Sequence, residues 1–184
     1  GIKFSNFKNI ANNKKIKKNF DKIIKNKNKI IESLGKNYLY SFNKKQLRKY
    51  KKFSNFRLIG MGGSILGTQT IYEFLKHKIK KNFIFEDNIQ NKKNISKKKF
   101  TNIIVSKSGN TIETIVNTNI LIKKNEKNIF ITENKKNYLH SLAQKLKADI
   151  VHHNNYIGGR YSVLSEVGML PAELMGLKSK NFRQ

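Results

Sequence analysis

The 184-residue sequence contains no cysteine, no tryptophan and a single proline, Pro171. The absence of cysteine excludes disulfide frameworks, thiolate nucleophiles and cysteine-ligated metals. No apolar run approaches the roughly 18 residues that a membrane-spanning helix requires. No apolar stretch of signal-peptide length follows the basic residues near Gly1. The sequence therefore predicts a soluble protein of a reducing compartment, the cytoplasm, without a membrane partner.

Acidic residues are also scarce, since 11 Asp and Glu stand against 39 Lys and Arg, which gives a formal net charge of +28. Such an excess is typical of proteins that bind nucleic acids. Yet arginine, the better ligand for phosphates and base edges, occurs only at Arg48, Arg57, Arg160 and Arg183. Lysine is enriched together with Asn, Ile and Phe, the residues that an AT-rich coding sequence supplies. A polyanion-binding surface stays open, but we favour compositional drift and expect no nucleic-acid partner.

Residues 1–50 are predicted to form a helical, lysine-rich extension. Apolar side chains recur at helical spacing from Ile16 to Leu34, and Gly35 is placed to end the helix. Lysine stems can cover apolar surface while their ammonium groups stay in water. We interpret this segment as an amphipathic helix packed across a sheet, rather than a helix that binds membranes or calmodulin.

Residues 51–184 alternate short apolar runs with segments of helical length, which predicts one α/β domain. The pattern favours a parallel sheet with helices on both faces, a flavodoxin-like three-layer sandwich. The predicted strands are 56–60, 83–85, 102–105, 128–131 and 150–152. Four helices are predicted: one after the first strand that ends near His77, one over 111–122, one over 139–146 and a last one that begins near Ser162. A lysine-rich connection covers 92–99. In such sheets ligands bind beyond the carboxyl ends of the strands.

The first loop at that edge is GMGGSILG, residues 60–67, between a predicted strand and helix. A Rossmann fingerprint would have glycine where Ile65 stands, and a P-loop would have lysine where Thr68 stands, so both motifs fail. The loop is then a glycine turn with Ser64 at the start of the helix. A serine there can cap the helix N-terminus or donate a hydrogen bond to a phosphate. A plain strand-to-helix turn explains this loop equally well.

The second loop is SKSGNTIET, residues 106–114, again between a strand and a helix. Ser106, Ser108 and Thr111 gather hydroxyls where a helix N-terminus already favours an anion, and Lys107 adds a positive charge. Such a loop can hold a phosphomonoester without metal. The alternative is a capping motif with Ser108 or Thr111 as the cap. Two hydroxyl-rich loops in neighbouring units favour phosphate, because both would face one crevice.

The third loop is IGGRYSVLSEVGMLPAEL, residues 157–174. Gly158 and Gly159 allow a sharp turn, and Arg160 is an arginine in a chain that otherwise uses lysine. An arginine kept in this setting suggests that its planar fork or permanent charge is needed. The alternative is a structural ion pair between Arg160 and a carboxylate.

Together, the stretches IGMGGSILGTQTIY, VSKSGNTIET and IGGRYSVLSEVGMLPAEL resemble the glucose-6-phosphate isomerase family, specifically its first sugar-isomerase (SIS) domain. The similarity runs from about Phe56 to the C-terminus. One departure is Glu166, where a small residue is common in the family, and it leaves the start of the last helix less certain.

The resemblance implies isomerisation of glucose 6-phosphate to fructose 6-phosphate, a step of glycolysis and gluconeogenesis, through an enediol without metal or organic cofactor. It places Arg160 in the active site, stabilising enediolate charge, with Gly159 in the substrate-binding loop. It also implies a homodimer. The positions that it assigns to the substrate phosphate are Gly63, Ser64, Ser106, Lys107, Ser108 and Thr111.

The family's glutamate base, ring-opening histidine and chain-end lysine lie in motifs downstream of this sequence. The adjacent pair His152–His153 does not suggest a metal site, because consecutive strand residues point to opposite faces. We therefore expect a fragment that lacks the second SIS domain and is inactive alone. The alternatives are a stand-alone SIS module that binds a phosphosugar without catalysis, and a nucleic-acid-binding surface.

Overall fold

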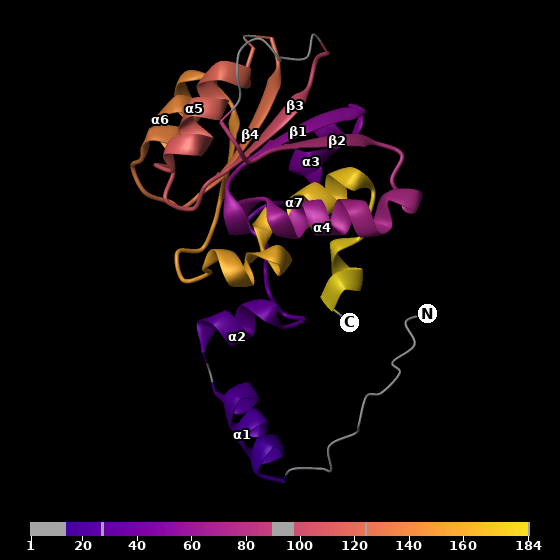
Figure 1. Ribbon diagram of the computed structural model, residues 1–184, viewed down its shortest axis with the longest axis vertical. Helices are drawn as coiled ribbons and strands as arrows, with labels where there is room; N and C mark the ends of the chain where they lie inside the picture. The colour runs from indigo at the N-terminus through magenta and orange to yellow at the C-terminus, as the bar shows by residue number, and fades with distance from the viewer. Residues whose placement is uncertain (1–13, 27, 90–97, 124, 184) are drawn as a thin grey trace.

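A computed structural model describes residues 14–26, 28–89, 98–123 and 125–183 of the chain (Figure 1). Its centre is a five-stranded sheet, all parallel, in the order β2-β1-β3-β4-β5. The strands are β1 (Asn55–Ile59), β2 (Asn82–Glu86), β3 (Thr101–Val105), β4 (Lys127–Thr132) and β5 (Asp149–His152). The predicted flavodoxin-like parallel sheet is confirmed, whereas most of the lysine-rich connection at 92–99 lies outside the described residues.

Helices cover both faces of the sheet, as predicted. In Figure 1, α5 and α6 lie on one side of the strands, and α4 and α7 lie on the other. The helices are α1 (Lys14–Lys25), α2 (Lys29–Leu34), α3 (Lys44–Lys51), α4 (Leu66–Leu75), α5 (Ile112–Leu121), α6 (Tyr138–Lys145) and α7 (Glu166–Met175). Short 3-10 helices are η1 (Gly62–Ser64), η2 (Lys76–Lys78), η4 (Gly159–Leu164) and η5 (Ser179–Arg183).

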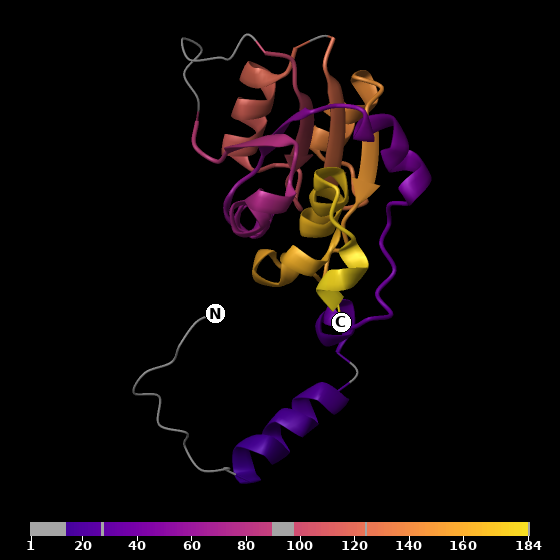
Figure 2. The same cartoon turned by 90° about the vertical axis from the view of Figure 1, so that its right-hand side faces the viewer.

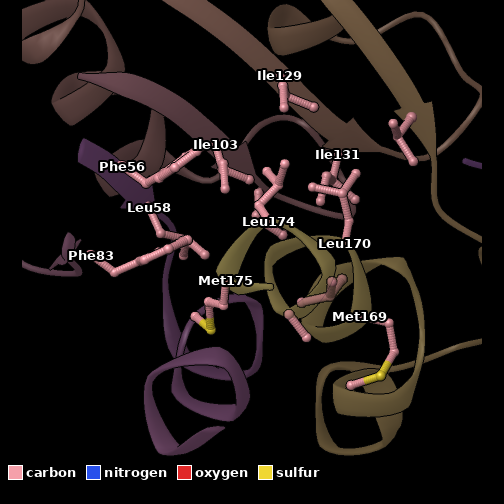
Figure 3. Packing of buried hydrophobic residues seen from close by; sticks show 14 of the residues in the cluster. Phe56, Leu58, Phe83, Ile103, Ile129, Ile131, Met169, Leu170, Leu174 and Met175 are labelled. Carbon is pink, nitrogen blue, oxygen red and sulfur yellow. The ribbon is translucent and has the colours of Figure 1, made fainter. Parts of the chain in front are cut away.

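The two-residue period of the strands divides the core into two layers. Phe56 and Leu58 of β1 point to the α4 and α7 side, where Leu170 and Leu174 meet them (Figure 3). Ile59 of β1 belongs instead to the smaller cluster under α5 and α6. Because both faces are covered, the strands read as nearly continuous apolar runs.

The N-terminal segment differs from its prediction. The expected single helix is two helices, since α1 ends at Lys25 and the side chain of Asn28 caps α2 by accepting from the Ile30 N–H at 2.8 Å. As predicted, Gly35 ends the second of them. The prediction that the amphipathic helix packs across the sheet is wrong for α1, which lies apart from the layers in both views (Figures 1 and 2). Its apolar residues are each more than half exposed: Ile16, Phe20, Ile23 and Ile24. The helical spacing of these residues places them on one face of α1, but it does not determine which surface packs against that face.

The chain between α2 and α3 is held against the domain by Arg183, near the C-terminus. The guanidinium of Arg183 donates to the carbonyls of Ser33 and Gly35, both at 2.7 Å, and to the Tyr40 hydroxyl at 2.8 Å. It also donates to the carbonyl of Leu164 in η4. Arg183 thereby brings the segment around residue 40 beside the third loop. Further along, Leu47 and Tyr50 of α3 are buried in the main core cluster.

Candidate functional site

The three loops singled out in the sequence follow the carboxyl ends of β1, β3 and β5, and the fold brings them together. A Cβ atom on Gly60 would lie 3.2 Å from the Val105 carbonyl oxygen, so the first two loops leave the sheet in contact. Lys107 Nζ donates to the Asn155 carbonyl at 2.9 Å, which joins the second loop to the chain just before the third. Strands β1 and β3 are neighbours at the point where the strand order reverses. In open α/β sheets this switch point is where ligands bind.

The first loop is a glycine turn between β1 and α4, and the structure explains why neither of the two nucleotide motifs is present. Ile65 is fully buried in the main core, where a Rossmann loop would need a third glycine. Thr68 is also buried, and its hydroxyl donates to the Val167 carbonyl at 3.0 Å, so it ties α4 to α7. Ser64 is half-buried in η1, directly before α4, and its backbone N–H is bonded to the Met61 carbonyl.

In the second loop the hydroxyls divide into buried and exposed members. The Ser106 Oγ lies 2.9 Å from the Thr111 Oγ1 and accepts from the Gly109 N–H at 3.2 Å. Ser108 is exposed, and its Oγ accepts from the Asn110 N–H at 3.3 Å, which leaves its hydroxyl proton for a ligand. Thr111 is the N-cap residue of α5 without a side-chain capping bond, so the capping alternative is not what orders this loop. The helix N-terminus therefore keeps its attraction for an anion.

Arg160 lies in η4 on the rim of a groove of about 700 Å³. Leu66, Thr70 and Tyr161 line the same groove. Gly63 and Gly159 line it too, whereas Ser64 and the second-loop residues do not. Within the described part of the chain, no carboxylate lies within 4.0 Å of the Arg160 guanidinium, so the ion-pair alternative has no partner there. Arg57 and Arg183, in contrast, are buried.

Sequence reasoning missed a buried polar cluster behind the third loop. Glu166 is fully buried at the first position of α7, which starts four residues later than predicted because η4 precedes it. Its carboxylate accepts from the Tyr38 hydroxyl at 2.9 Å and the Ser41 N–H at 2.9 Å. His153 Nδ1 lies 3.6 Å from the same carboxylate. The one signal in the sequence was that Glu166 replaces a small residue of the related family.

Burial and hydrogen bonding oppose each other at Glu166. Burial is the largest single influence and raises the pKa of the Glu166 carboxyl. Contacts from His153, the Ser41 N–H and the Tyr38 hydroxyl favour the charged form, and together they hold the pKa below its usual value. Burial, and next the charge of Glu166, raise the pKa of the Tyr38 hydroxyl far above its usual value, so Tyr38 stays a donor. The cluster therefore contains a buried carboxylate.

No group of three His, Cys, Asp or Glu side chains suited to a metal ion occurs among the residues that the structure describes. His152 is exposed on β5 and His153 is buried just after it, so the two histidines do separate as their adjacency predicts. Searching the same described residues, we find no helix long and apolar enough to cross a bilayer.

Gly63 makes the closest contact between the first and third loops, and its substitution gives a direct test of that contact. A Cβ atom at this position would lie 2.5 Å from the Gly159 backbone, which is too close for either chain to keep its place. We expect Gly63→Ala to lower the free energy of unfolding by about 1–3 kcal/mol, measured by urea denaturation. The matched control is Gly158→Ala, where the nearest atom lies 3.9 Å away. Equal free energies of unfolding for the two variants would contradict the close contact between Gly63 and the Gly159 backbone.

Residues 11–184 match the protein-family model described as phosphoglucose isomerase. Curated glucose-6-phosphate isomerases are similar in sequence. That of Methanocaldococcus jannaschii is 34% identical over 155 residues, which cover 77% of this chain and 38% of the relative. That of Borreliella afzelii is 37% identical over 143 residues, which cover 65% of this chain and 26% of the relative. The chain thus spans well under half the length of these relatives.

Solved structures share the fold. A hypothetical protein of Thermus thermophilus superimposes with a TM-score of 0.65 at 21% identity, over 91% of this chain and 44% of that protein. The NanR protein of Vibrio vulnificus, solved as a complex with ManNAc-6P, superimposes with a TM-score of 0.54 at 18% identity, over 73% of this chain and 53% of NanR.

Proposed function

Because the chain belongs to the phosphoglucose isomerase family, we propose that it is the phosphate-binding part of an isomerase that interconverts glucose 6-phosphate and fructose 6-phosphate. In this reaction a proton moves between two adjacent carbons through an enediolate, and the substrate phosphate stays bound throughout. The sugar phosphates place the enzyme in glycolysis and gluconeogenesis. In the whole protein we expect a cytoplasmic homodimer, and neither a metal nor an organic cofactor enters the proposal.

The observation that carries the proposal is the pairing of two hydroxyl-bearing loops at the switch point of the sheet. Ser64 precedes α4 and Ser108 precedes α5, so each loop offers a hydroxyl beside a helix N-terminus. Helix N-termini attract anions through free N–H groups and the helix dipole. A phosphate between the loops would accept from Ser64 and Ser108, with the Gly63 backbone close by, while Ser106 and Thr111 hold the second loop in shape. Lys107 adds positive charge at the same edge.

We assign Arg160 to the reacting end of the sugar. It is an exposed guanidinium at the mouth of an otherwise largely apolar groove, next to the turn at Gly159. Negative charge develops on the enediolate oxygens as the proton leaves carbon, and a fixed guanidinium would stabilise that charge. The proton itself needs a general base, which the family resemblance places downstream of this sequence.

The phosphate proposal is tested by calorimetric titration of the 184-residue chain with fructose 6-phosphate. We expect Ser108→Ala to weaken binding about tenfold, because a hydrogen bond to a charged oxygen contributes roughly 1.5–3 kcal/mol. The matched control is Ser54→Ala, an exposed serine before β1, at the opposite edge of the sheet. Binding that both substitutions leave unchanged would argue against a phosphate site in the second loop.

A separate assay distinguishes an isomerase part from a self-sufficient enzyme. We expect the 184-residue chain to bind the sugar phosphate without interconverting glucose 6-phosphate and fructose 6-phosphate. The measurement is the appearance of glucose 6-phosphate by a coupled assay, with a complete isomerase as the positive control. Turnover at an enzyme-like rate would show that the base lies within these residues, contrary to the proposal.

A further inference from the structure

Glu166, His153 and Tyr38 form a closed polar cluster directly behind the turn that carries Arg160. Glu166 is fully buried and His153 is 4% exposed, whereas Tyr38 is half-buried. The Tyr38 hydroxyl donates to Glu166 and accepts from the Asn154 side chain at 3.0 Å. The cluster thus links α7, the chain after β5 and the N-terminal segment, three parts of the molecule that are distant in sequence.

The surroundings of the His153 ring determine how many protons it carries. Nε2 lies 3.1 Å from the Ile157 carbonyl oxygen, which can only accept, so Nε2 bears a proton. Nδ1 has no hydrogen-bond partner among the described residues, and the nearest charged atom is the Glu166 Oε2 at 3.6 Å. A lone pair on Nδ1 would face a carboxylate and be repelled, whereas a proton there forms a buried ion pair. The geometry therefore favours an imidazolium at His153 paired with an ionised Glu166.

The same groups hold the chain that leads to Arg160. His153 fixes the Ile157 carbonyl, and Tyr38 fixes the Asn154 side chain. At the other end, the Ser162 Oγ lies within hydrogen-bond distance of two carbonyl oxygens, that of Gly159 at 2.8 Å and that of Gly63 at 3.0 Å, and its single proton can go to either. Arg160 itself has no ion pair within the described residues, so its place depends on the backbone that carries it.

We propose that Glu166, His153 and Tyr38 are positioning residues that fix the Arg160 turn through a buried, proton-dependent ion pair. The inference rests on the proposed function for the role of Arg160, but the ion pair itself can be tested without it.

The ion pair predicts how the turn responds to pH. Glu166 contributes stability above its usual pKa, because its pKa is lowered in the folded protein, and this contribution is lost as the pH falls through the lowered pKa. The other ionisable groups beside the cluster are Tyr156 and Arg183, and the guanidinium of Arg183 lies over the Tyr38 ring at 4.8 Å. Because burial and the charge of Glu166 raise the pKa of Tyr38, Tyr38 keeps its proton, and the loss of stability at low pH follows the lowered pKa of Glu166.

The ion pair is tested by ¹⁵N NMR of the imidazole rings in the labelled 184-residue chain at about pH 6.5, near the usual pKa of histidine. We expect both His153 ring nitrogens to be protonated in the unmodified chain. In Glu166→Gln we expect a neutral ring protonated at Nε2 alone. The matched control is His152→Gln, an exposed neighbour, which should leave the His153 signals unchanged. A neutral His153 ring in the unmodified chain at this pH overturns the proposal, and this reading needs no variant to fold.

The effect on Arg160 is tested with two probes. Inorganic phosphate reports on the first two loops alone, and 5-phosphoarabinonate carries a carboxylate where the enediolate charge would lie. We expect Glu166→Gln and Tyr38→Phe each to weaken binding of 5-phosphoarabinonate about tenfold and to leave phosphate binding unchanged.

The outcomes separate the two proposals. If the chain binds neither probe, the proposed function fails, while the NMR result still decides the ion pair. If Glu166→Gln and Tyr38→Phe fold, as their circular dichroism shows, and bind both probes normally, the positioning role is overturned although the phosphate site stands. Loss of both probes together in the folded variants also overturns it, because the effect would then not be specific to Arg160.

Discussion

Replacing Arg160 with lysine is expected to lower kcat/KM for isomerisation by the complete protein about 10²–10³-fold. This is the usual effect of removing one fixed donor from a site that stabilises an oxyanion. Lysine keeps the charge but loses the planar fork, and its ammonium is a more flexible and more strongly hydrated point charge. The measurement is steady-state conversion of fructose 6-phosphate.

The stability of the same variant should hardly change. Arg160 is exposed and lies near no carboxylate within the described residues, so its loss leaves no buried group unpaired. We expect the free energy of unfolding to change by less than about 0.5 kcal/mol. A parallel loss of stability and activity would show that Arg160 is a structural residue. A variant with full activity would remove it from the site altogether.

Replacing Arg57 with methionine should have the opposite outcome, a large loss of stability. Arg57 is 1% exposed within the sheet, and its guanidinium lies 3.9 Å from the Glu126 carboxylate and 4.0 Å from that of Glu86. It also donates to the Leu121 carbonyl at 2.9 Å and lies over the Phe100 ring at 4.3 Å. Burial lowers the pKa of Arg57, and the two carboxylates oppose that shift.

Methionine fills much of the same space but leaves Glu126 buried without its counter-charge. Removing one partner of a buried pair typically costs about 3–5 kcal/mol, and we expect a loss of that size in urea denaturation. The added change Glu126→Gln should recover part of the loss by removing the unpaired charge. The matched control is Arg48→Met on the exposed face of α3, which we expect to change stability by less than about 0.5 kcal/mol. A loss below about 1 kcal/mol for Arg57→Met would mean that Glu126 is not ionised when buried.

The layered domain was predictable because its signals are local. Each strand is a short apolar run, and each of the three loops after the strand ends carries the glycine or hydroxyl residues that are typical of strand-to-helix turns. Helical periodicity also predicted α1, but the prediction that its apolar face packs against the sheet was wrong. A helical pattern records which side chains share a face, whereas the surface that covers that face depends on the rest of the chain. The 3-10 helix η4 was missed because the sequence from about Ser162 was interpreted as the start of the last helix.

The sequence indicated which residues of the candidate site to consider, but not the buried residues that hold the Arg160 turn in place. The hydroxyls of the second loop and the isolated Arg160 were visible as residues of unusual type in unusual places. Tyr38 and Ser41 carry no such signal, because a tyrosine and a serine in a lysine-rich segment resemble any others. Their role exists only once Arg183 holds that segment beside Glu166. Pairings between such distant residues cannot be read from spacing in one sequence.

The distance along the chain between Tyr38 and Glu166 also bears on how the protein is made. The two residues are 128 positions apart, and their hydrogen bond closes the cluster behind the Arg160 turn. Ribosomes add about 5–20 residues per second, so on the order of ten seconds pass after Tyr38 is synthesised before its partner exists. The sheet from β1 to β5 is complete in sequence before then. During synthesis all five strands therefore exist in the chain before the residue that completes the cluster around Tyr38.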